Sequence, residues 1–108
     1  MIKGEIIDVA LDLRRDKKTF GKHFSVKLSE FNKEQLLIPV GFAHGFSVIS
    51  KEAIVLYKTD NLYAPDFEKA VKFNDPHLNI DWNISEDLII LSEKDKLNEL
   101  FDTKMTYF

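Results

Sequence analysis

The 108 residues are enough for one domain with a modest core, and 44% hydrophobic with 31% charged residues is a soluble globular composition. A formal net charge of −3 leaves no basic surplus for phosphates, so nucleic-acid binding is excluded as the main role. The absence of cysteine excludes disulfides, thiol nucleophiles and thiolate metal ligands.

The N-terminal stretch MIKGEIIDVALDLRRD carries a charge every few positions, which fits neither a signal peptide nor a membrane span. We therefore expect a cytoplasmic protein that does not bind membranes. Apolar and polar residues alternate over Gly4–Leu13 and His23–Ser29, which predicts two strands. In the first, one face carries Ile7, Val9, Leu11 and Leu13, and the other carries Ile6, Asp8, Ala10 and Asp12.

Four shorter segments are further strand candidates: Leu36–Pro39 as a buried run, Gly45–Ser50, Ala53–Thr59 and Ala70–Phe73. Many short strands separated by turns are typical of a β-sandwich or barrel. The tail differs, because Ser92 and Asp95 have the spacing of a capping box. Apolar residues at helical spacing follow, which predicts a helix from about Glu93 to Thr103.

The most distinctive motif is IPVGFAHGF, in which Pro39, Gly41 and His44 form the pattern P-x-G-x-x-H. Proline fixes φ and glycine permits a tight turn, so the pattern suits a turn that leads into a strand carrying the histidine. The pattern resembles the second motif of the cupin superfamily. The three histidines His23, His44 and His77 are unpaired in the sequence, so we expect no metal site. By itself His44 is equally a packed core residue.

A wider set of motifs resembles the dTDP-4-dehydrorhamnose 3,5-epimerases of nucleotide-sugar metabolism. These motifs occur in the family's order across nearly the whole chain: the D-x-R run at 12–14, TFG at 19–21, IPVGFAHGF, LYKT at 56–59, YAP at 63–65, NDP at 74–76, IDW at 80–82 and LSEKD at 91–95. They match the C-terminal part of the family pattern.

The resemblance implies a mainly β, cupin-type jelly roll (a double-stranded β-helix), incomplete here, with a short C-terminal helix. It divides the chain into residues 1–91, a core that lacks the family's N-terminal strands, and residues 92–108, the helix and tail. It also implies a homodimer, which would cover the open sheet edges. The family's substrate is a dTDP-linked 4-keto-6-deoxy sugar, and no metal or redox cofactor is needed.

The chemistry that the resemblance implies is proton transfer. Protons on C3 and C5 are acidic because they lie α to the C4 ketone, so a base removes one, an acid returns one to the opposite face, and a hydrogen-bonding or cationic group holds the enolate.

Five residues match the family's site positions: Tyr57 the general acid, Asp95 the carboxylate that pairs with the catalytic base, and His44, Glu68 and Lys94 the substrate contacts. Three of them have simpler explanations. Tyr57 also fits the packed face of a strand, Lys94 a solvated helix start, and Asp95 the capping box with Ser92.

Two departures from the family pattern matter. The family's general base, a histidine in an Arg-Gly-Leu-His segment, and a lysine that follows it would precede Met1, so we expect little turnover from these 108 residues alone. Leu62 stands where the family has an aromatic that stacks on the nucleotide base, so the identity of that base is open. The alternatives are a 3- or 5-epimerase, and a non-catalytic cupin that binds sugar nucleotides or serves for dimerisation.

Overall fold

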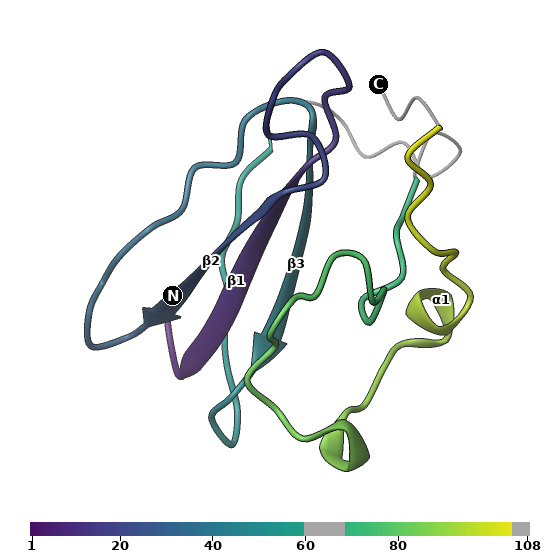
Figure 1. Cartoon of the computed structure of the whole chain (residues 1–108). Coiled ribbons are helices and arrows are strands. Elements are labelled where there is room, and N and C mark those ends of the chain that lie inside the picture. Colours follow the sequence, from purple (N-terminus) through teal and green to yellow (C-terminus); the bar gives the residue numbers. More distant parts are fainter. Residues whose placement is uncertain (60–68, 105–108) are drawn as a thin grey trace.

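The fold is centred on one antiparallel sheet of three strands, and the computed structural model describes residues 1–59 and 69–104 (Figure 1). The strands are β1 (Glu5–Asp12), β2 (His23–Ser29) and β3 (Phe42–Val48), in the order β2-β1-β3. The central strand β1 is buried over most of its length, which confirms the mainly β class predicted from the alternating pattern.

The register of the sheet gives it two chemically different faces. On one face, here called the covered face, Leu11 lies opposite Ala43 and Val9 lies opposite Gly45, so this face is apolar where β1 and β3 meet. On the other, here called the His44 face, Ala10 lies opposite His44 and Asp8 lies opposite Phe46. One strand thus presents aliphatic side chains to one side and two carboxylates, Asp8 and Asp12, to the other.

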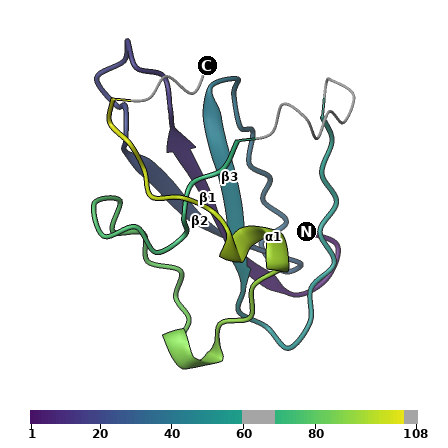
Figure 2. The same ribbon diagram turned by 90° about the vertical axis from the view of Figure 1, so that its right-hand side faces the viewer.

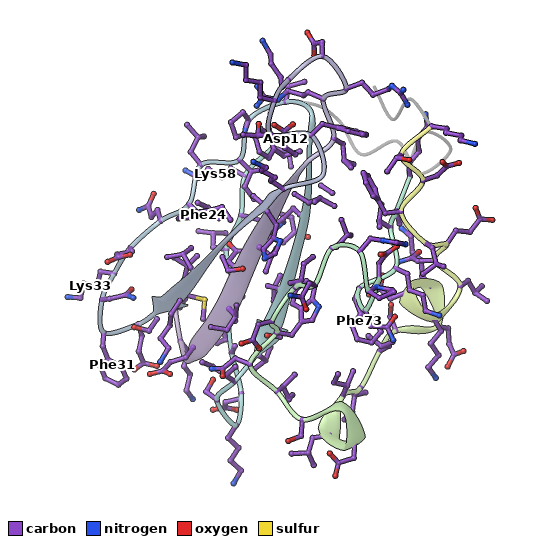
Figure 3. All side chains as sticks on the ribbon, viewed as in Figure 1. Asp12, Phe24, Phe31, Lys33, Lys58 and Phe73 are labelled. Atoms are coloured by element: carbon purple, nitrogen blue, oxygen red, sulfur yellow. The ribbon has the colours of Figure 1, made fainter. Side chains whose placement is uncertain are left out.

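Residues 69–104 pack against the covered face (Figures 1 and 2). A buried cluster of Leu11, Leu13 and Leu78 forms the core, with Ala43, Val71, Ile80 and Phe101 partly buried against it. Burial of such aliphatic side chains contributes about 1.5–3 kcal/mol each. In Figure 3, Phe73 in this segment and Phe24 on β2 lie on opposite sides of the sheet.

The IDW motif owes its structural role to Trp82. Its Nε1 donates to the carbonyl of Phe73 at 2.8 Å, and its own carbonyl accepts from Ser47 Oγ at 2.6 Å. A Cβ at Gly45 would meet Trp82 Cη2 at 3.1 Å, so the indole packs closely over this glycine on β3. This contact ties residues 73–82 to β3, the strand that carries His44.

The NDP motif acts through a buried carboxylate. Asp75 is 1% exposed, and it accepts hydrogen bonds from the backbone N–H groups of His77 at 2.7 Å and Phe101 at 2.6 Å. It therefore joins the loop at 75–79 to the C-terminal segment, which satisfies its buried oxygens.

The turn before β3 confirms the role expected of Gly41 in IPVGFAHGF. Its φ of +93° lies in the region that only glycine adopts without strain. A Cβ there would stand 2.4 Å from Arg14 Cγ, so the glycine also lets the 14–21 turn approach β3 closely.

Three of the strand expectations are wrong. Leu36–Pro39 is not buried, since Leu37 is 89% exposed. Ala53–Thr59 has no ladder, only an isolated bridge between Lys3 and Ile54, and Ala70–Phe73 is not a strand. In each case the apolar pattern is present, but no neighbouring strand among the described residues supplies a continuous ladder. The third strand starts at Phe42 rather than Gly45, because β1 extends far enough to pair with it.

The predicted C-terminal helix is much shorter than expected. The α-helix α1 covers only Glu93–Lys96, after a 3₁₀ turn (η2) at Glu86–Leu88. Ser92 is the N-cap as predicted and accepts from the Asp95 N–H at 3.2 Å. Leu97 and Leu100 are 82% and 56% exposed, so the residues that directly follow α1 do not pack on the core, and a short helix without packing does not extend.

Candidate functional site

The candidate site begins with an imidazole–carboxylate pair across β1 and β3. His44 Nε2 bonds to Asp8 Oδ1. The Asp8 side chain is 9% exposed, whereas the His44 side chain is 34% exposed. A buried carboxylate therefore holds one nitrogen of the His44 ring, while part of the ring remains accessible to solvent. A packed core histidine would not be accessible.

The surroundings of His44 are aromatic and apolar. The Phe46 ring lies 6.1 Å from the imidazole between centroids, tilted by 37°. On the same face of the sheet, Phe24, Phe46 and Val48 are 57%, 41% and 38% exposed. The His44 face thus offers a polar pair within an accessible apolar surface, a combination that suits an organic ligand with a few hydrogen-bonding groups.

Tyr57 is 70% exposed and lies in the 53–59 segment, which the pictures place away from α1 (Figures 1 and 2). The interpretation of Tyr57 as a packed strand residue is wrong, because Ala53–Thr59 has no ladder and the ring is open to solvent.

Lys94 and Asp95 stand on α1, whose side chains are exposed. The Asp95 carboxylate accepts from Asn98 Nδ2 at 3.5 Å, while its backbone N–H serves the Ser92 cap. The cap therefore uses the Asp95 main chain and leaves the carboxylate accessible. α1 belongs to the segment over the covered face, so the described residues do not bring Lys94 and Asp95 onto the His44 face (Figure 1).

Glu68, the remaining predicted substrate contact, lies outside the described residues, as do Leu62 and the YAP motif. Within the described ranges, no group of three His, Asp or Glu side chains could hold a metal ion. In the same ranges, no helix is long and apolar enough to cross a bilayer.

A second cluster, which the sequence marked only as motifs, surrounds Asp12 (Figure 3). Asp12 is 1% exposed and accepts from Arg14 Nε at 2.9 Å, Arg14 Nη2 at 2.8 Å, the Arg14 N–H at 2.9 Å and Thr19 Oγ1. The Arg14 guanidinium also lies 4.7 Å above the Phe42 ring. We call these four residues the Asp12 knot.

The knot explains why the D-x-R and TFG motifs occur together. The hydrogen bonds from Arg14 hold the pKa of Asp12 well below its usual range, with Thr19 adding to the effect and burial opposing it. In return, the hydrogen bond to Asp12 raises the pKa of Arg14. The knot closes the 14–21 turn on the start of β3 and thereby fixes the strand that carries His44.

Sequence reasoning missed both Asp8 and the knot as parts of the site. The available signal was the alternation itself. One face of β1 reads Ile6, Asp8, Ala10 and Asp12, and two carboxylates within a face that is otherwise apolar require partners if the strand is buried.

Comparison with known proteins gives a consistent result. The sequence pattern of the dTDP-4-dehydrorhamnose 3,5-epimerases matches residues 1–103. The enzyme of that name from Pseudomonas aeruginosa is 50% identical over 98 residues, which cover 91% of this chain and 54% of the relative. The one from Escherichia coli is 45% identical over 106 residues, 94% of this chain and 57% of the relative.

Solved structures agree. The dTDP-4-dehydrorhamnose 3,5-epimerase from Elizabethkingia anophelis superposes with a TM-score of 0.90 at 50% identity, over 93% of this chain and 55% of that one. A dTDP-6-deoxy-D-glucose-3,5-epimerase from Legionella pneumophila, solved with dTDP-4-keto-L-rhamnose, gives 0.79 at 38% identity, over 92% and 52%.

The chain therefore spans about half the length of the curated relatives that it matches. The match extends over nearly all of its residues. It includes the strands of the sheet and the motifs around Gly41, Asp75 and Trp82. This chain belongs to the dTDP-4-dehydrorhamnose 3,5-epimerase family.

Proposed function

We propose that the protein acts on a dTDP-linked 4-keto-6-deoxy sugar and takes part in its epimerisation at C3 and C5. The observation that carries the proposal is the accessible His44 in its apolar surroundings, within a chain that matches the epimerase family over residues 1–103. The Legionella relative, solved with dTDP-4-keto-L-rhamnose, supports the substrate class.

The roles follow from the chemistry of each side chain. Tyr57 is the general acid, because a phenol hydroxyl can deliver its proton to an enolate carbon. His44 contacts the sugar, and Glu68 and Lys94 bind the substrate. Asp95 pairs with the catalytic base. The proton transfers need no redox cofactor and no metal.

Deuterium incorporation tests this function. The protein as its gene encodes it is incubated with dTDP-4-keto-6-deoxyglucose in deuterated water, and NMR follows each carbon. We expect one deuterium at C3 and one at C5, above a control without protein. Incorporation at only one carbon would assign a 3- or 5-epimerase instead. Calorimetric binding of the dTDP-sugar without incorporation would establish the alternative, a non-catalytic sugar-nucleotide-binding cupin.

We also propose that the protein is a homodimer. Several large apolar side chains are exposed in the described ranges, among them Phe24, Leu37, Val40 and Ile54, and monomers rarely leave large apolar areas to solvent. β2 and β3 are also the two edge strands of the described sheet, and unpaired edges favour pairing with another chain. Sedimentation at micromolar concentration is expected to show a dimer, and a monomer at all concentrations tested would contradict the proposal.

A further inference from the structure

Asp8 is a buried carboxylate in the middle of a strand, and none of the site roles proposed above uses it. Its two nearest neighbours along the same face of β1 are the apolar Ile6 and Ala10. A carboxylate in such a place is costly unless a charged or hydrogen-bonding partner meets it. The partner in the structure is His44.

The register explains why the two side chains meet. Ala10 lies directly opposite His44, and Asp8 lies opposite Phe46, so Asp8 and His44 are diagonal neighbours across β1 and β3. Diagonal pairs are within reach of long side chains. Ala10 leaves only a methyl group beneath the imidazole, so the ring can lean along β1 towards Asp8.

The bond determines which ring nitrogen a ligand meets. An ionised carboxylate only accepts hydrogen bonds, so the nitrogen that faces it, Nε2, carries the hydrogen. The described residues supply no partner for Nδ1. When the ring is neutral, Nδ1 is a lone-pair acceptor, and the bond made by one ring nitrogen fixes the state of the other.

We propose that Asp8 is a positioning residue for His44. It keeps the hydrogen on Nε2 and turns Nδ1 outward as the acceptor of a hydrogen bond from a sugar hydroxyl. Asp8 does not touch the ligand, and it acts only through the imidazole. This assignment rests on the proposed function for its ligand, but the orientation of the ring is a property of the free protein.

The first test needs no ligand. In ¹⁵N-labelled protein, NMR is expected to show a slowly exchanging His44 Nε2–H in the wild type. The signal is expected to disappear in Asp8→Ala and to persist in Asp8→Asn, whose amide oxygen can still accept. Asp87→Ala, an exposed carboxylate in η2, is the matched control and should leave the signal unchanged. A His44 ring without an Nε2–H bond in the wild type would overturn the proposal.

The second test is a double-mutant cycle on the binding of dTDP-glucose, a stable sugar nucleotide with free hydroxyls. Loss of one hydrogen bond to the sugar predicts about three- to tenfold weaker binding for Asp8→Ala when His44 is present. In the His44→Ala background the same substitution should change the affinity less than about twofold. Asp8→Asn should recover part of the loss.

The outcomes separate the two proposals. Equal losses from Asp8→Ala with and without His44 would show that Asp8 acts on stability or on the ligand itself, and would overturn its positioning role. If the wild type binds no dTDP-glucose, the proposed function fails, and the Nε2–H signal alone decides whether Asp8 orients His44.

Discussion

Tyr57→Phe is expected to slow formation of the inverted product from dTDP-4-keto-6-deoxyglucose by about 10²- to 10⁴-fold, the range typical of a general acid. The substitution removes only the phenolic oxygen and keeps the ring. Because Tyr57 is 70% exposed, its hydroxyl is not part of the core, and the unfolding transition should not move. The measurement is NMR of the sugar in deuterated water, and it uses the full-length protein.

The same experiment also separates removal of a proton from its return to the opposite face. If Tyr57 returns a proton to one face of the sugar, the variant should still remove protons and should lose the inverted product. Leu56→Ala, next in sequence and 64% exposed, is the control for a general disturbance of this segment. Full inversion at both carbons by Tyr57→Phe would rule the tyrosine out as the acid, and an equal loss in Leu56→Ala would assign the effect to the segment.

The strands that alternation predicted correctly are those that belong to one continuous ladder. His23–Ser29 was predicted with the bounds it has, and β1 differs from Gly4–Leu13 by one residue at each end. Ala53–Thr59 has an equally apolar composition but forms a single bridge, at Ile54. Composition and period show that a segment can form a strand. Whether it does also depends on a neighbouring strand at hydrogen-bonding distance.

The start of α1 could be predicted from the sequence, but its length could not. The capping signal at Ser92 is local, so the sequence located the start of α1 correctly at Glu93. Its end depends on whether the apolar stripe finds a surface. Leu97 and Leu100 are exposed, and the helix ends at Lys96. Local chemistry could thus be predicted from the sequence, but the length of the element could not.

The candidate site divides in a similar way. His44 was found because its motif is contiguous, with a glycine that the turn requires. Asp8 was missed because its role appears only when β1 and β3 are in register, 36 residues apart in sequence. The family resemblance supplied Tyr57, Lys94 and Asp95, and their joint geometry around a substrate stays a prediction.

Asp12→Ala is expected to destabilise the fold strongly. It removes the acceptor of three hydrogen bonds from Arg14 and one from Thr19 and leaves the cation without its partner. Removal of one member of a buried pair costs 3–5 kcal/mol, and because the Arg14 side chain is 34% exposed and can rehydrate, we expect about 2–4 kcal/mol. Urea unfolding at neutral pH measures the free energy of unfolding directly.

The matched control is Asp16→Ala, a carboxylate in the same turn that is exposed and also near Arg14. An exposed charge of this kind should change the free energy of unfolding by less than about 0.5 kcal/mol. If Asp12→Ala does not fold, Thr19→Val removes a single bond of the Asp12 knot and should cost about 1 kcal/mol. Equal stability of the Asp12 and Asp16 variants would contradict the role of the knot.

The pH dependence gives an independent signature. The hydrogen bonds from Arg14 keep the pKa of Asp12 in the folded protein below its value of about 3.9 in an unfolded chain. Stability from this carboxylate is therefore fully present above about pH 4 and is lost as the pH falls further, because the unfolded state binds the proton first. In Asp12→Asn this loss should be absent, so the difference from wild type should shrink on acidification, whereas for Asp16→Ala it should stay small throughout. Since the knot closes the 14–21 turn on Gly41 and Phe42, acid should also loosen the start of β3. The His44 Nε2–H signal should then weaken in the wild type together with the loss of stability.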